Sequence, residues 1–418
     1  MKLYLLALFC TCSLPLLAGD DQQLALEIRA QSDFDRVEIT RSPQIQETAA
    51  CIQSQAALIP VASRAELSSI YFHKGFCTLA GAAVTRHSED FTAAAQALEK
   101  SIEAWPDALT RNGKSSPEPV SSGLRILAAI AHIEAGSDPG AMAQFEKEIS
   151  AAVDTPRCST IIMPAALCSA AINTGRQWLG WFALKRGDRL EARREFTAAS
   201  ASSWQHWTTG LDSWAYKLYP EAASEFHQAV DGWSQAARRT GALLDRLAPL
   251  PDMPHVLIQL ASAQILSGDA AGAIPTLDAA TKADPKLSQA IFLRARAREL
   301  TGQAEQALAD YSLASRTAFA NAQDLMSGEA HLYRGILFYL RHDYQKAEDE
   351  FSSSLNFDIP AGQRPDAEAW RHLAAVAGGA CGDSRRLLEE ALEHVSPFFP
   401  KQQARERAAS CPLSISGA

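Results

Sequence analysis

Two neighbouring stretches decide the fold: PHVLIQLASAQILSGDAAGAIPTLDAATKADP, which begins at Pro254, and SQAIFLRARARELTGQAEQALADYSLASRT, which begins at Ser288. With the second stretch shifted back by 34 residues, small residues meet small residues and large apolar residues meet large ones. The matched pairs are Ala261 with Ala295, Gly268 with Gly302, Ala273 with Ala307, Leu277 with Tyr311, and Ala280 with Ala314. Agreement at five positions of a single offset indicates an internal repeat.

Each repeat unit is predicted to be a pair of antiparallel helices. The steps from Ala273 to Leu277 and on to Ala280 are four and three residues, which places the three side chains on one helix face. Gly268 suits the left-handed position that ends a first helix, and the Asp after it suits the N-cap of a second helix. The same Gly-Asp junction is expected at Gly187-Asp188 and at Gly382-Asp383.

The units resemble tetratricopeptide repeats, in which W-x2-L-G-x2-Y is followed by A-x3-F and then by A and P. Three units supply these residues clearly: Leu179-Gly180, Ala192, Phe196 and Ala199; Leu260-Ala261, Ala273, Leu277, Ala280 and Pro285; and Gly335, Phe338, Ala347 and Phe351. The resemblance covers roughly residues 42–395. It implies an all-α fold, an α-solenoid of stacked antiparallel helix pairs in a TPR-like superhelix.

Three irregular stretches interrupt the array, at residues 107–122, 152–164 and 247–254. The last contains Pro249, Pro251 and Pro254 and cannot be helix interior. We therefore expect a lead segment over residues 19–41, irregular TPR-like repeats over 42–247, a regular TPR array over 254–395, and a C-terminal capping helix and tail over 396–418.

The N-terminus has the layout of a secretory signal peptide. Residues 1–18 read MKLYLLALFCTCSLPLLA, in which Lys2 precedes an apolar run that ends at the small residue Ala18. That run is short for a membrane span, which needs about 20 residues. We expect cleavage near Ala18, export to the periplasm or secretion, and no membrane span in the mature chain; an uncleaved anchor is the alternative.

Six cysteines follow the predicted signal peptide, and they fall as three sequence-local pairs. No CxxC spacing occurs, which argues against a zinc site. Six cysteines allow 15 connectivities, of which pairing between neighbours is the simplest. The candidate disulfides are Cys51–Cys77, Cys158–Cys168 and Cys381–Cys411, and buried free thiols are the alternative.

Composition and motifs argue against several functions. The 418-residue chain has a net charge of −9, which disfavours nucleic acid and anionic membrane surfaces as partners. The sequence has no Gly-rich phosphate loop, no HExxH and no GxSxG. We therefore expect no cofactor, no metal site and no catalytic residues.

In the tetratricopeptide family, ligands usually lie in a groove lined by the first helix of each unit. Carried over to this chain, the resemblance assigns nine groove residues: His255, Ile258, Ser262, Gln289, Phe292, Arg296, Glu329, Leu332 and Ile336. The Lys and Asn pattern that clamps a C-terminal carboxylate in some members is absent. The groove is predicted to be mainly apolar, with Arg296 paired to Glu299. Such a groove suits an amphipathic helix or extended segment, or the next turn of the protein's own superhelix.

Six of the eight tryptophans lie between residues 178 and 233. Trp204 and Trp207 fall outside the motif positions, so they are candidates for an exposed patch that binds peptide or glycan. Packing between helices is the alternative. Two function classes follow: a non-catalytic exported scaffold that binds a protein or peptide in the bacterial envelope, or an envelope enzyme or carbohydrate-binding protein with a site in the aromatic-rich N-terminal half.

Overall fold

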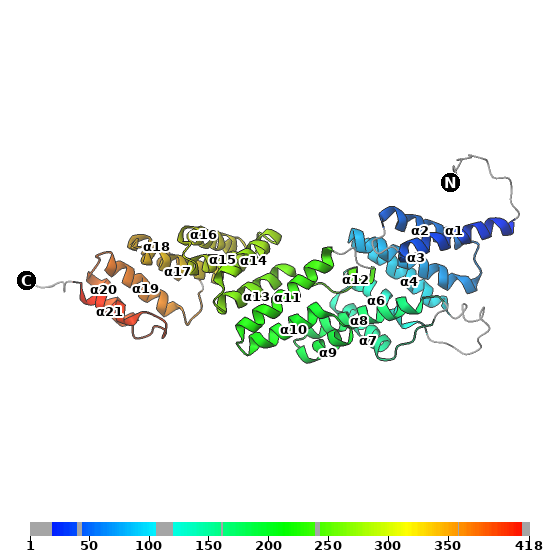
Figure 1. Cartoon of the computed structure of the whole chain (residues 1–418). Helices are drawn as coiled ribbons and strands as arrows, with labels where there is room; N and C mark the ends of the chain where they lie inside the picture. Colours follow the sequence, from blue (N-terminus) through cyan, green and yellow to red (C-terminus); the bar gives the residue numbers. More distant parts are fainter. Residues whose placement is uncertain are drawn as a thin grey trace, which may run out of the picture. The chain divides into compact units, whose positions relative to one another are not determined.

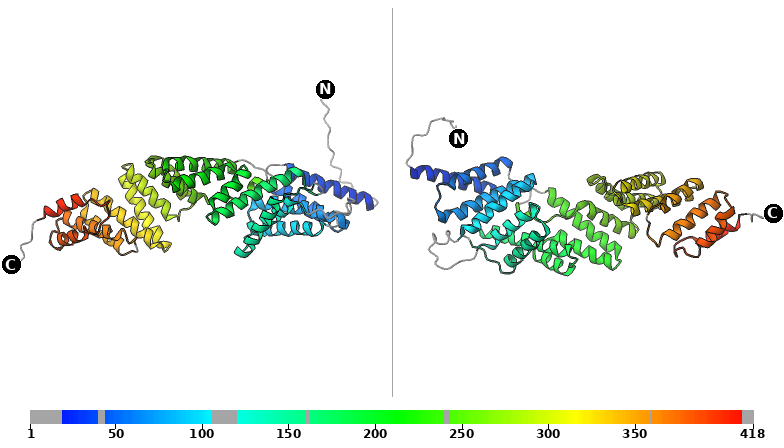
Figure 2. Two further views of the ribbon diagram at one scale, coloured as in Figure 1. Left: turned by 90° about the horizontal axis from the view of Figure 1, so that it is seen from below. Right: turned by 180° about the vertical axis from the view of Figure 1, so that it is seen from behind.

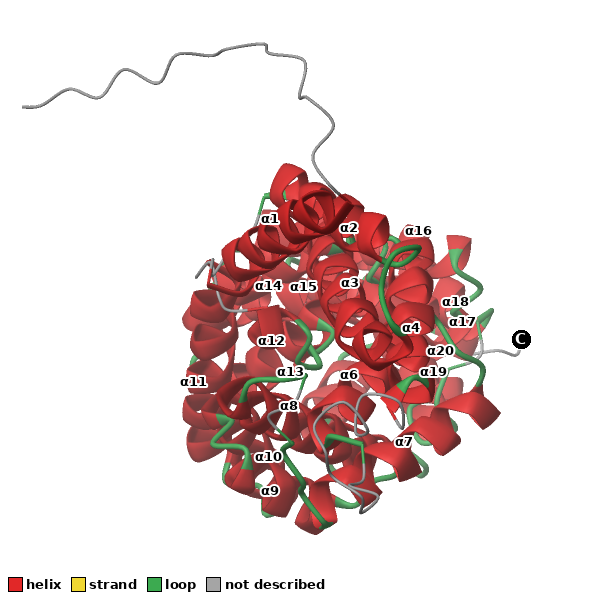
Figure 3. Cartoon of the chain, turned by 90° about the vertical axis from the view of Figure 1, so that its right-hand side faces the viewer, coloured by secondary structure: helices red, strands yellow, loops and turns green. Residues whose placement is uncertain are grey.

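The structure is a computed structural model that describes residues 19–39, 44–105, 120–159, 162–238, 243–357 and 359–411. Every regular element among these residues is a helix, and they contain no strand (Figure 3). The predicted all-α fold class is therefore confirmed. The predicted signal peptide over residues 1–18, most of the 107–122 connection and the end of the C-terminal tail lie outside the described residues.

By packing, the chain divides into two compact units, Met1–Thr208 with Asp231–Pro249, and Thr209–Val230 with Leu250–Ala418. The helices of the first unit are α1 (Gly19–Ile39), α2 (Ile45–Leu58), α3 (Arg64–Thr85), α4 (Ser88–Glu103), α6 (Ser122–Glu134), α7 (Pro139–Asp154), α8 (Ala165–Lys185), α9 (Arg189–Ala198) and α12 (Leu243–Arg246) (Figure 1). Two helices contain boundaries between the units: α10 (Ser202–Ala215) and α11 (Tyr219–Arg238).

The helices of the second unit form successive hairpins. They are α13 (Met253–Leu266), α14 (Ala270–Ala283), α15 (Ser288–Leu300), α16 (Ala304–Ala320), α17 (Asp324–Leu340), α18 (Tyr344–Leu355), α19 (Arg364–Ala377), α20 (Gly382–Ala391) and α21 (Lys401–Ala409) (Figure 2). Each helix from α13 to α20 packs on the next, and the first helices α13, α15, α17 and α19 also contact one another in turn. This is the stacking of an α-solenoid.

The repeat register predicted from the sequence is confirmed by burial. Apart from the two turn glycines, the residues matched across the 34-residue offset are all fully buried. Where the first helix carries Gly in place of Ala, an aromatic ring fills the space. A Cβ atom built on Gly335 would lie 2.7 Å from a ring carbon of Phe351, and one on Gly180 would lie 2.6 Å from Phe196. Close contact with the second helix therefore explains the small residue of the motif.

The turns between paired helices use a left-handed residue, as predicted. Gly187, Gly268 and Gly302 have φ of +81°, +91° and +78°. Lys217 takes the equivalent position between α10 and α11 with φ of 60°. The junction predicted at Gly382-Asp383 is wrong: Gly379 is the left-handed residue there, with φ of +97°. Gly382 is instead the first residue of α20, because α19 has already ended at Ala377.

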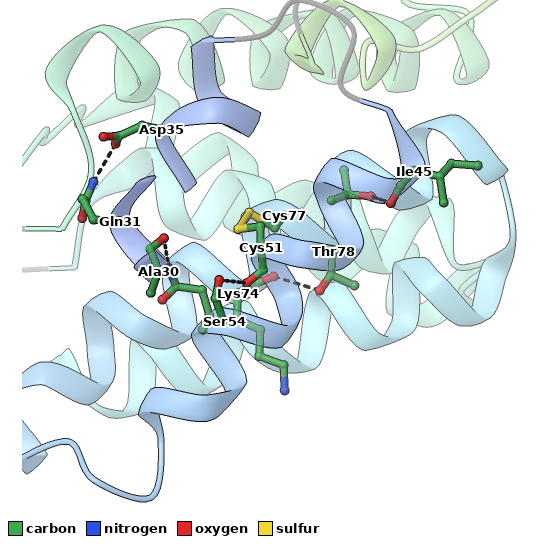
Figure 4. The surroundings of a disulfide bond; sticks show 11 residues. Ala30, Gln31, Asp35, Ile45, Cys51, Ser54, Lys74, Cys77 and Thr78 are labelled. Carbon is green, nitrogen blue, oxygen red and sulfur yellow. Dashed lines mark hydrogen bonds between the residues drawn. A yellow bond between two sulfur atoms is a disulfide. The ribbon is translucent and has the colours of Figure 1, made fainter. Parts of the chain in front are cut away.

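The cysteines lie together in the three predicted neighbour pairs. The Cα–Cα distances are 6.2 Å for Cys51–Cys77, 5.8 Å for Cys158–Cys168 and 5.5 Å for Cys381–Cys411, all within the span of a disulfide. Cys51–Cys77 joins α2 to α3 (Figure 4). Cys411 reaches Cys381 because α20 packs against α21.

The proline-rich connection begins inside the first unit. Leu247 is fully buried in the core of that unit, and its carbonyl accepts a hydrogen bond of 2.8 Å from the indole N–H of Trp178. The boundary between the compact units falls after Pro249. The irregular stretch over residues 247–254 is therefore packed into the first unit at its first residue, which the proline pattern did not indicate.

Candidate functional site

Three of the nine predicted groove residues are buried. Ile258, Phe292 and Leu332 are 4%, 9% and 5% exposed. Each lies three residues before the small motif residue of its first helix and packs in a core cluster with residues of neighbouring helices. For example, the Phe292 ring centroid lies 5.7 Å from that of Tyr311 and 5.5 Å from that of Tyr333. These three assignments are corrected: the side chains stabilise the stack and cannot contact a partner.

The other six groove residues remain accessible to different degrees. His255 and Gln289 are exposed, while Ser262, Arg296, Glu329 and Ile336 are partly buried. The amide of Gln363 donates a hydrogen bond of 3.1 Å to the carboxylate of Glu329. This face of the first helices is therefore polar at its beginning and becomes more apolar toward its end.

Arg296 is satisfied within the protein. Its guanidinium pairs with Glu299 at 2.6 Å, as predicted, and lies 4.4 Å from the ring centroid of Tyr333. The Tyr311 hydroxyl donates to the same Glu299 carboxylate at 2.5 Å. Burial, together with the negative charge of Glu299, raises the pKa of Tyr311 above its ordinary value. The single cation of the predicted groove thus adds little net charge to it.

The same helix face continues into a row of exposed leucines that the sequence analysis missed. Leu266, Leu300 and Leu340 are 53%, 55% and 60% exposed at the ends of α13, α15 and α17. Each lies four residues after a partly buried groove residue: Ser262, Arg296 and Ile336, respectively. A step of four residues keeps a side chain on one helix face, so extending the predicted stripe by one turn would have found this leucine row.

Trp204 and Trp207 do not form an exposed patch. They are 4% and 8% exposed. Trp204 stacks on Phe196 with ring centroids 5.0 Å apart and meets Trp233 edge-on at 4.9 Å. Trp207 lies 6.0 Å from Trp233. The exposed-patch prediction is therefore corrected, because these rings fill the space between α9, α10 and α11, as the packing alternative expected.

Buried or partly buried carboxylates link the two helices of three hairpins. Asp310 is 4% exposed and accepts hydrogen bonds of 2.7–2.8 Å from Arg294 and of 2.7 Å from Arg298. Its hydrogen bond raises the pKa of Arg294 above the ordinary value. In two other hairpins, Glu195 pairs with Arg176 at 3.0 Å and Glu350 pairs with Arg334 at 3.1 Å.

Each of these carboxylates immediately precedes the large residue of the repeat motif: Tyr311, Phe196 and Phe351. We call this arrangement the carboxylate clasp. Its signal in the sequence is an Asp or Glu directly before the motif aromatic residue, with Arg on the preceding helix. From sequence alone such an acidic residue is expected to face solvent, because Asp and Glu on an amphipathic helix are rarely buried.

Ser315, His331 and Glu350 have the connectivity of a hydrolytic triad. Ser315 Oγ lies 2.9 Å from His331 Nε2, and His331 Nδ1 lies 2.8 Å from Glu350 Oε2. Ser315, however, is 7% exposed and sits within α16, where backbone N–H groups are engaged along the helix. Ser315 Oγ also lies 3.0 Å from Ser327 Oγ, so we interpret the arrangement as a polar contact among α16, α17 and α18.

A cavity of about 470 Å³ lies among α1, α2 and α3 in the first unit, with Ile162 as a further wall. Its polar lining includes the side chains of Gln55, His73, Glu27 and Glu66. Gln55 is 1% exposed, and its Nε2 donates a hydrogen bond of 2.9 Å to the Ala30 carbonyl. No sequence motif predicts this cavity, because its lining comes from three helices that meet only in the folded chain.

His73 is held neutral in the wall of the cavity. Its ring stacks on Phe34 with centroids 3.9 Å apart. Burial lowers the pKa of His73 to about 4, although the nearby Asp35 acts in the opposite direction. Neutral imidazole can accept one hydrogen bond and donate another, so at pH 7 this side chain offers the cavity both functions.

No group of three His, Cys, Asp or Glu within the described ranges lies close enough to hold a metal ion. No helix in the described part of the chain is long and apolar enough to cross a membrane.

Solved structures of tetratricopeptide repeat proteins match the chain at low identity. YrrB, described as a TPR protein with an unusual peptide-binding site, is 14% identical over 44% of this chain and 84% of its own, with a TM-score of 0.35. TTC0263, a thermophilic TPR protein of Thermus thermophilus, is 19% identical over 50% of this chain and 97% of its own, with a TM-score of 0.33. Yeast Tom70 is 12% identical over 94% of this chain and 96% of its own, with a TM-score of 0.37.

No protein-family model matches the chain, and no curated protein matches it. Because the structural similarities are low, the assignment of the class rests on the chain's own packing. Helix hairpins that recur after 34 residues, with buried small residues and a left-handed turn at matched positions, define a helical-repeat solenoid. The residues at these positions resemble those of the tetratricopeptide motif, so the chain has the fold of a tetratricopeptide-like α-solenoid.

Proposed function

We propose that this protein is an exported, non-catalytic tetratricopeptide scaffold of the bacterial envelope. It binds a protein or peptide partner on the first-helix face of α13, α15 and α17. The leucine row carries this proposal, since three consecutive repeats expose Leu266, Leu300 and Leu340 at one equivalent position. Full burial of a leucine side chain is worth about 1.5–3 kcal/mol, so a partner that covers the row gains substantial binding free energy.

The chemistry of this face defines the partner. Its one cation, Arg296, is neutralised by Glu299, and the leucines are its most exposed apolar side chains. A partner segment that offers apolar side chains at intervals matched to the repeats fits this surface, either as an amphipathic helix or as an extended peptide. Acidic net charge disfavours nucleic acid as the partner.

Export is supported by the first 18 residues and by the cysteines. The leader has the order of charge, apolar run and small residue that secretion signals share. The three cysteine pairs have Cα–Cα distances suited to disulfides, which persist in oxidising compartments. We infer that the mature chain is oxidised at all three pairs after it leaves the cytoplasm.

The binding face is tested by a triple substitution, L266S/L300S/L340S. The mature protein, with a photo-crosslinking residue at position 289, is used to capture a partner from the host envelope, and the affinity of the purified partner is then measured. We expect the triple variant to weaken binding by at least about tenfold, the equivalent of 1.4 kcal/mol. The control is Leu313→Ser, which changes a leucine that is 39% exposed on the second helix α16. Equal loss in both variants would reject the proposed face.

Export and oxidation are tested together on protein recovered from the envelope. N-terminal sequencing is expected to begin near residue 19, and alkylation without reduction is expected to leave Cys381 and Cys411 unlabelled. A full-length N-terminus or a freely alkylated Cys411 would contradict this part of the proposal.

The non-catalytic assignment is tested at Ser315. A fluorophosphonate probe is expected to leave the wild-type chain unlabelled, because the serine is buried and its hydroxyl is in contact with Ser327 and His331. Labelling that disappears in Ser315→Ala would show a reactive serine and would favour the enzyme alternative.

A further inference from the structure

The last helix of the second unit, α21, contributes few side chains to the core. It has nine residues, of which Ala404 and Ala408 are buried, while the remaining residues are exposed or partly exposed. An isolated helix shorter than about 12–15 residues is only marginally stable in water. The helical conformation of α21 therefore depends on the contacts that hold it against α19 and α20.

The polar side chains of α21 add little to these contacts, because they lie near the protein surface. The guanidinium of Arg407 donates a hydrogen bond of 3.0 Å to the Tyr344 hydroxyl. Arg405 lies 4.0 Å from Glu393, and these side chains are 59% and 72% exposed. An ion pair with this exposure contributes little to stability.

The strongest link of α21 is covalent. Cys411 follows α21 and Cys381 precedes α20, with their Cα atoms 5.5 Å apart. The Cys411 carbonyl also accepts a hydrogen bond of 3.1 Å from Arg385 of α20. A disulfide that closes a loop of 30 residues restricts the chain more than a single hydrogen bond does. The position of α21 therefore depends mainly on this disulfide.

The chain before α21 is held on α19 without the help of α21. The backbone N–H and the hydroxyl of Ser396 donate hydrogen bonds of 2.7 Å and 2.6 Å to the Asp366 carboxylate. Phe399 is 5% exposed, and its ring centroid lies 5.1 Å from that of Trp370. If the disulfide opens, the segment that ends at Phe399 is therefore expected to stay in place, and α21 is expected to move away from Pro400 onward.

The surface that α21 covers is apolar. Ala404 and Ala408 belong to one buried cluster with Leu373 and Val376 of α19 and Leu388 of α20. The helix packs against both α19 and α20 at the C-terminal end of the second unit (Figure 1). At the end of a solenoid, this is the kind of surface on which a further repeat stacks. Release of α21 would therefore expose an apolar face.

We propose that the Cys381–Cys411 disulfide is a redox switch that controls α21. In the oxidised protein α21 covers the apolar face of α19 and α20, and reduction of the disulfide by a dithiol protein releases α21 and exposes that face. This inference rests on the oxidation proposed above and is independent of the leucine row.

The switching step is a thiol–disulfide exchange that transfers two electrons from the dithiol to the protein. Cys381 is partly exposed and Cys411 is 5% exposed, so the thiolate of the dithiol attacks Cys381 Sγ. A mixed disulfide forms, the bond between the two protein sulfurs breaks, and Cys411 leaves as a thiolate that takes up a proton. The second thiol of the reductant loses its proton and attacks the mixed disulfide. The reductant leaves as a disulfide, and the Cys381 thiolate is protonated.

The pair Cys158–Cys168 in the first unit supplies a matched control. Cys158 is exposed, so this pair is also accessible to a reductant. It joins the connection after α7 to α8 across 10 residues. The Arg157 carbonyl in that connection also accepts a hydrogen bond of 2.8 Å from the Ser122 N–H. Opening this pair is therefore expected to release no helix.

Hydrogen exchange measured by mass spectrometry on the full mature protein tests the inference. Peptide mapping without reduction first identifies the linked Cys381–Cys411 peptide in the oxidised protein. That protein is then compared with C381S/C411S and with the control C158S/C168S. In C381S/C411S we expect α21 to exchange about tenfold faster or more, with α13 and α14 unchanged. We also expect increased fluorescence of the dye anilinonaphthalene sulfonate, which binds exposed apolar surface. The control variant is expected to show neither change.

The possible outcomes separate this inference from the proposed oxidation. A missing linked peptide would overturn both. A linked peptide with equal protection of α21 in all three proteins, or with no increase in dye fluorescence in C381S/C411S, would overturn the switch and leave the oxidation intact. Loss of protection throughout the second unit would also overturn the switch, because the disulfide would then stabilise the whole unit. If C381S/C411S does not fold, the wild-type protein before and after treatment with dithiothreitol gives the same comparison.

Discussion

The two units use the same structural element, the antiparallel helix pair, but distribute their apolar residues differently. In the second unit the buried residues fall into separate clusters, each confined to one hairpin and its neighbour. In the first unit one large cluster runs from Phe34 in α1 to Leu247 after α12, and a small second cluster joins Ala30, Leu58 and Ile70. The regular repeats therefore have local cores, while most of the less regular helices share one large core. That irregular packing also encloses the cavity beside Gln55 and His73.

The three cysteine pairs are also distributed differently between the two units. Two of the three cysteine pairs lie in the first unit, and the third closes the last helices of the second unit. A regular array gains stability from each neighbour in turn, so only its terminal unit lacks a partner. The repeats of the first unit are less regular, and its two links join α2 to α3 and the connection after α7 to α8.

We expect the largest loss of stability when the carboxylate clasp of Asp310 is removed. This change tests whether the hairpins of the second unit have separate cores. Asp310→Ala leaves Arg294 and Arg298 without their buried partner, so the second unit is expected to lose about 3–5 kcal/mol. Hydrogen exchange measured by mass spectrometry should increase in α15 and α16 and stay unchanged in α3 and α4. The control is Glu305→Ala, which removes an exposed pair with Arg341 and should change nothing measurable. Faster exchange throughout both units would refute the division into local cores.

Lowering the pH should destabilise the first unit, because His73 is buried there as a neutral group. Its pKa is about 4 in the folded protein, below the unfolded value of 6.5, so the unfolded chain binds the proton more readily. This contribution to stability is complete above about pH 6.5 and is lost as the pH falls to about 4, with a total on the order of 3 kcal/mol. Urea unfolding at both pH values measures it, and His73→Gln should remove this part of the pH dependence. Parallel pH profiles for the two proteins would show that His73 is not buried as a neutral group.

Placing a larger side chain at the contact within one hairpin should lower stability by a smaller amount. Ala307 is fully buried at the contact between α15 and α16, and Ala307→Leu is expected to destabilise the second unit by about 1–3 kcal/mol. Ala309 is exposed on the same helix, so Ala309→Leu is the matched control and should leave the melting temperature nearly unchanged. Equal melting temperatures for the two variants would mean that the helix register is wrong.

The smallest expected effect is a gain in stability at a turn. Lys217 has φ of 60° where other repeats place Gly268 or Gly302, and a left-handed backbone costs a residue with a Cβ roughly 1 kcal/mol. Lys217→Gly should therefore stabilise the hairpin by about 0.5–1 kcal/mol after allowance for glycine's greater freedom in the unfolded chain. Thermal unfolding measures the gain, and the reverse change Gly302→Lys should lower the melting temperature. A lower melting temperature for Lys217→Gly would show that the Lys217 side chain makes a stabilising contact.

The sequence by itself determined the features that depend on local spacing. These are the repeat register, the small residues Ala261 and Ala295, the left-handed turns at Gly268 and Gly302, and the pairing of neighbouring cysteines. Helix periodicity and turn geometry involve residues within a few turns of one another, so they can be read from one chain. The error at Gly382 has the same origin, because Gly-Asp resembled the other junctions while Gly378-Gly379 had already ended the helix.

Only the tertiary structure decided which residues along a helix face are buried and which are exposed. Phe292 and Leu300 lie on one stripe of α15, yet the first is 9% exposed and the second is 55% exposed. Phe292 is covered by Tyr311 of α16 and Tyr333 of α17, and no spacing within α15 encodes these contacts. The burial of Trp204, the clasp at Asp310 and the cavity beside Gln55 have the same cause. Each of them depends on side chains from helices that meet only when the stack forms.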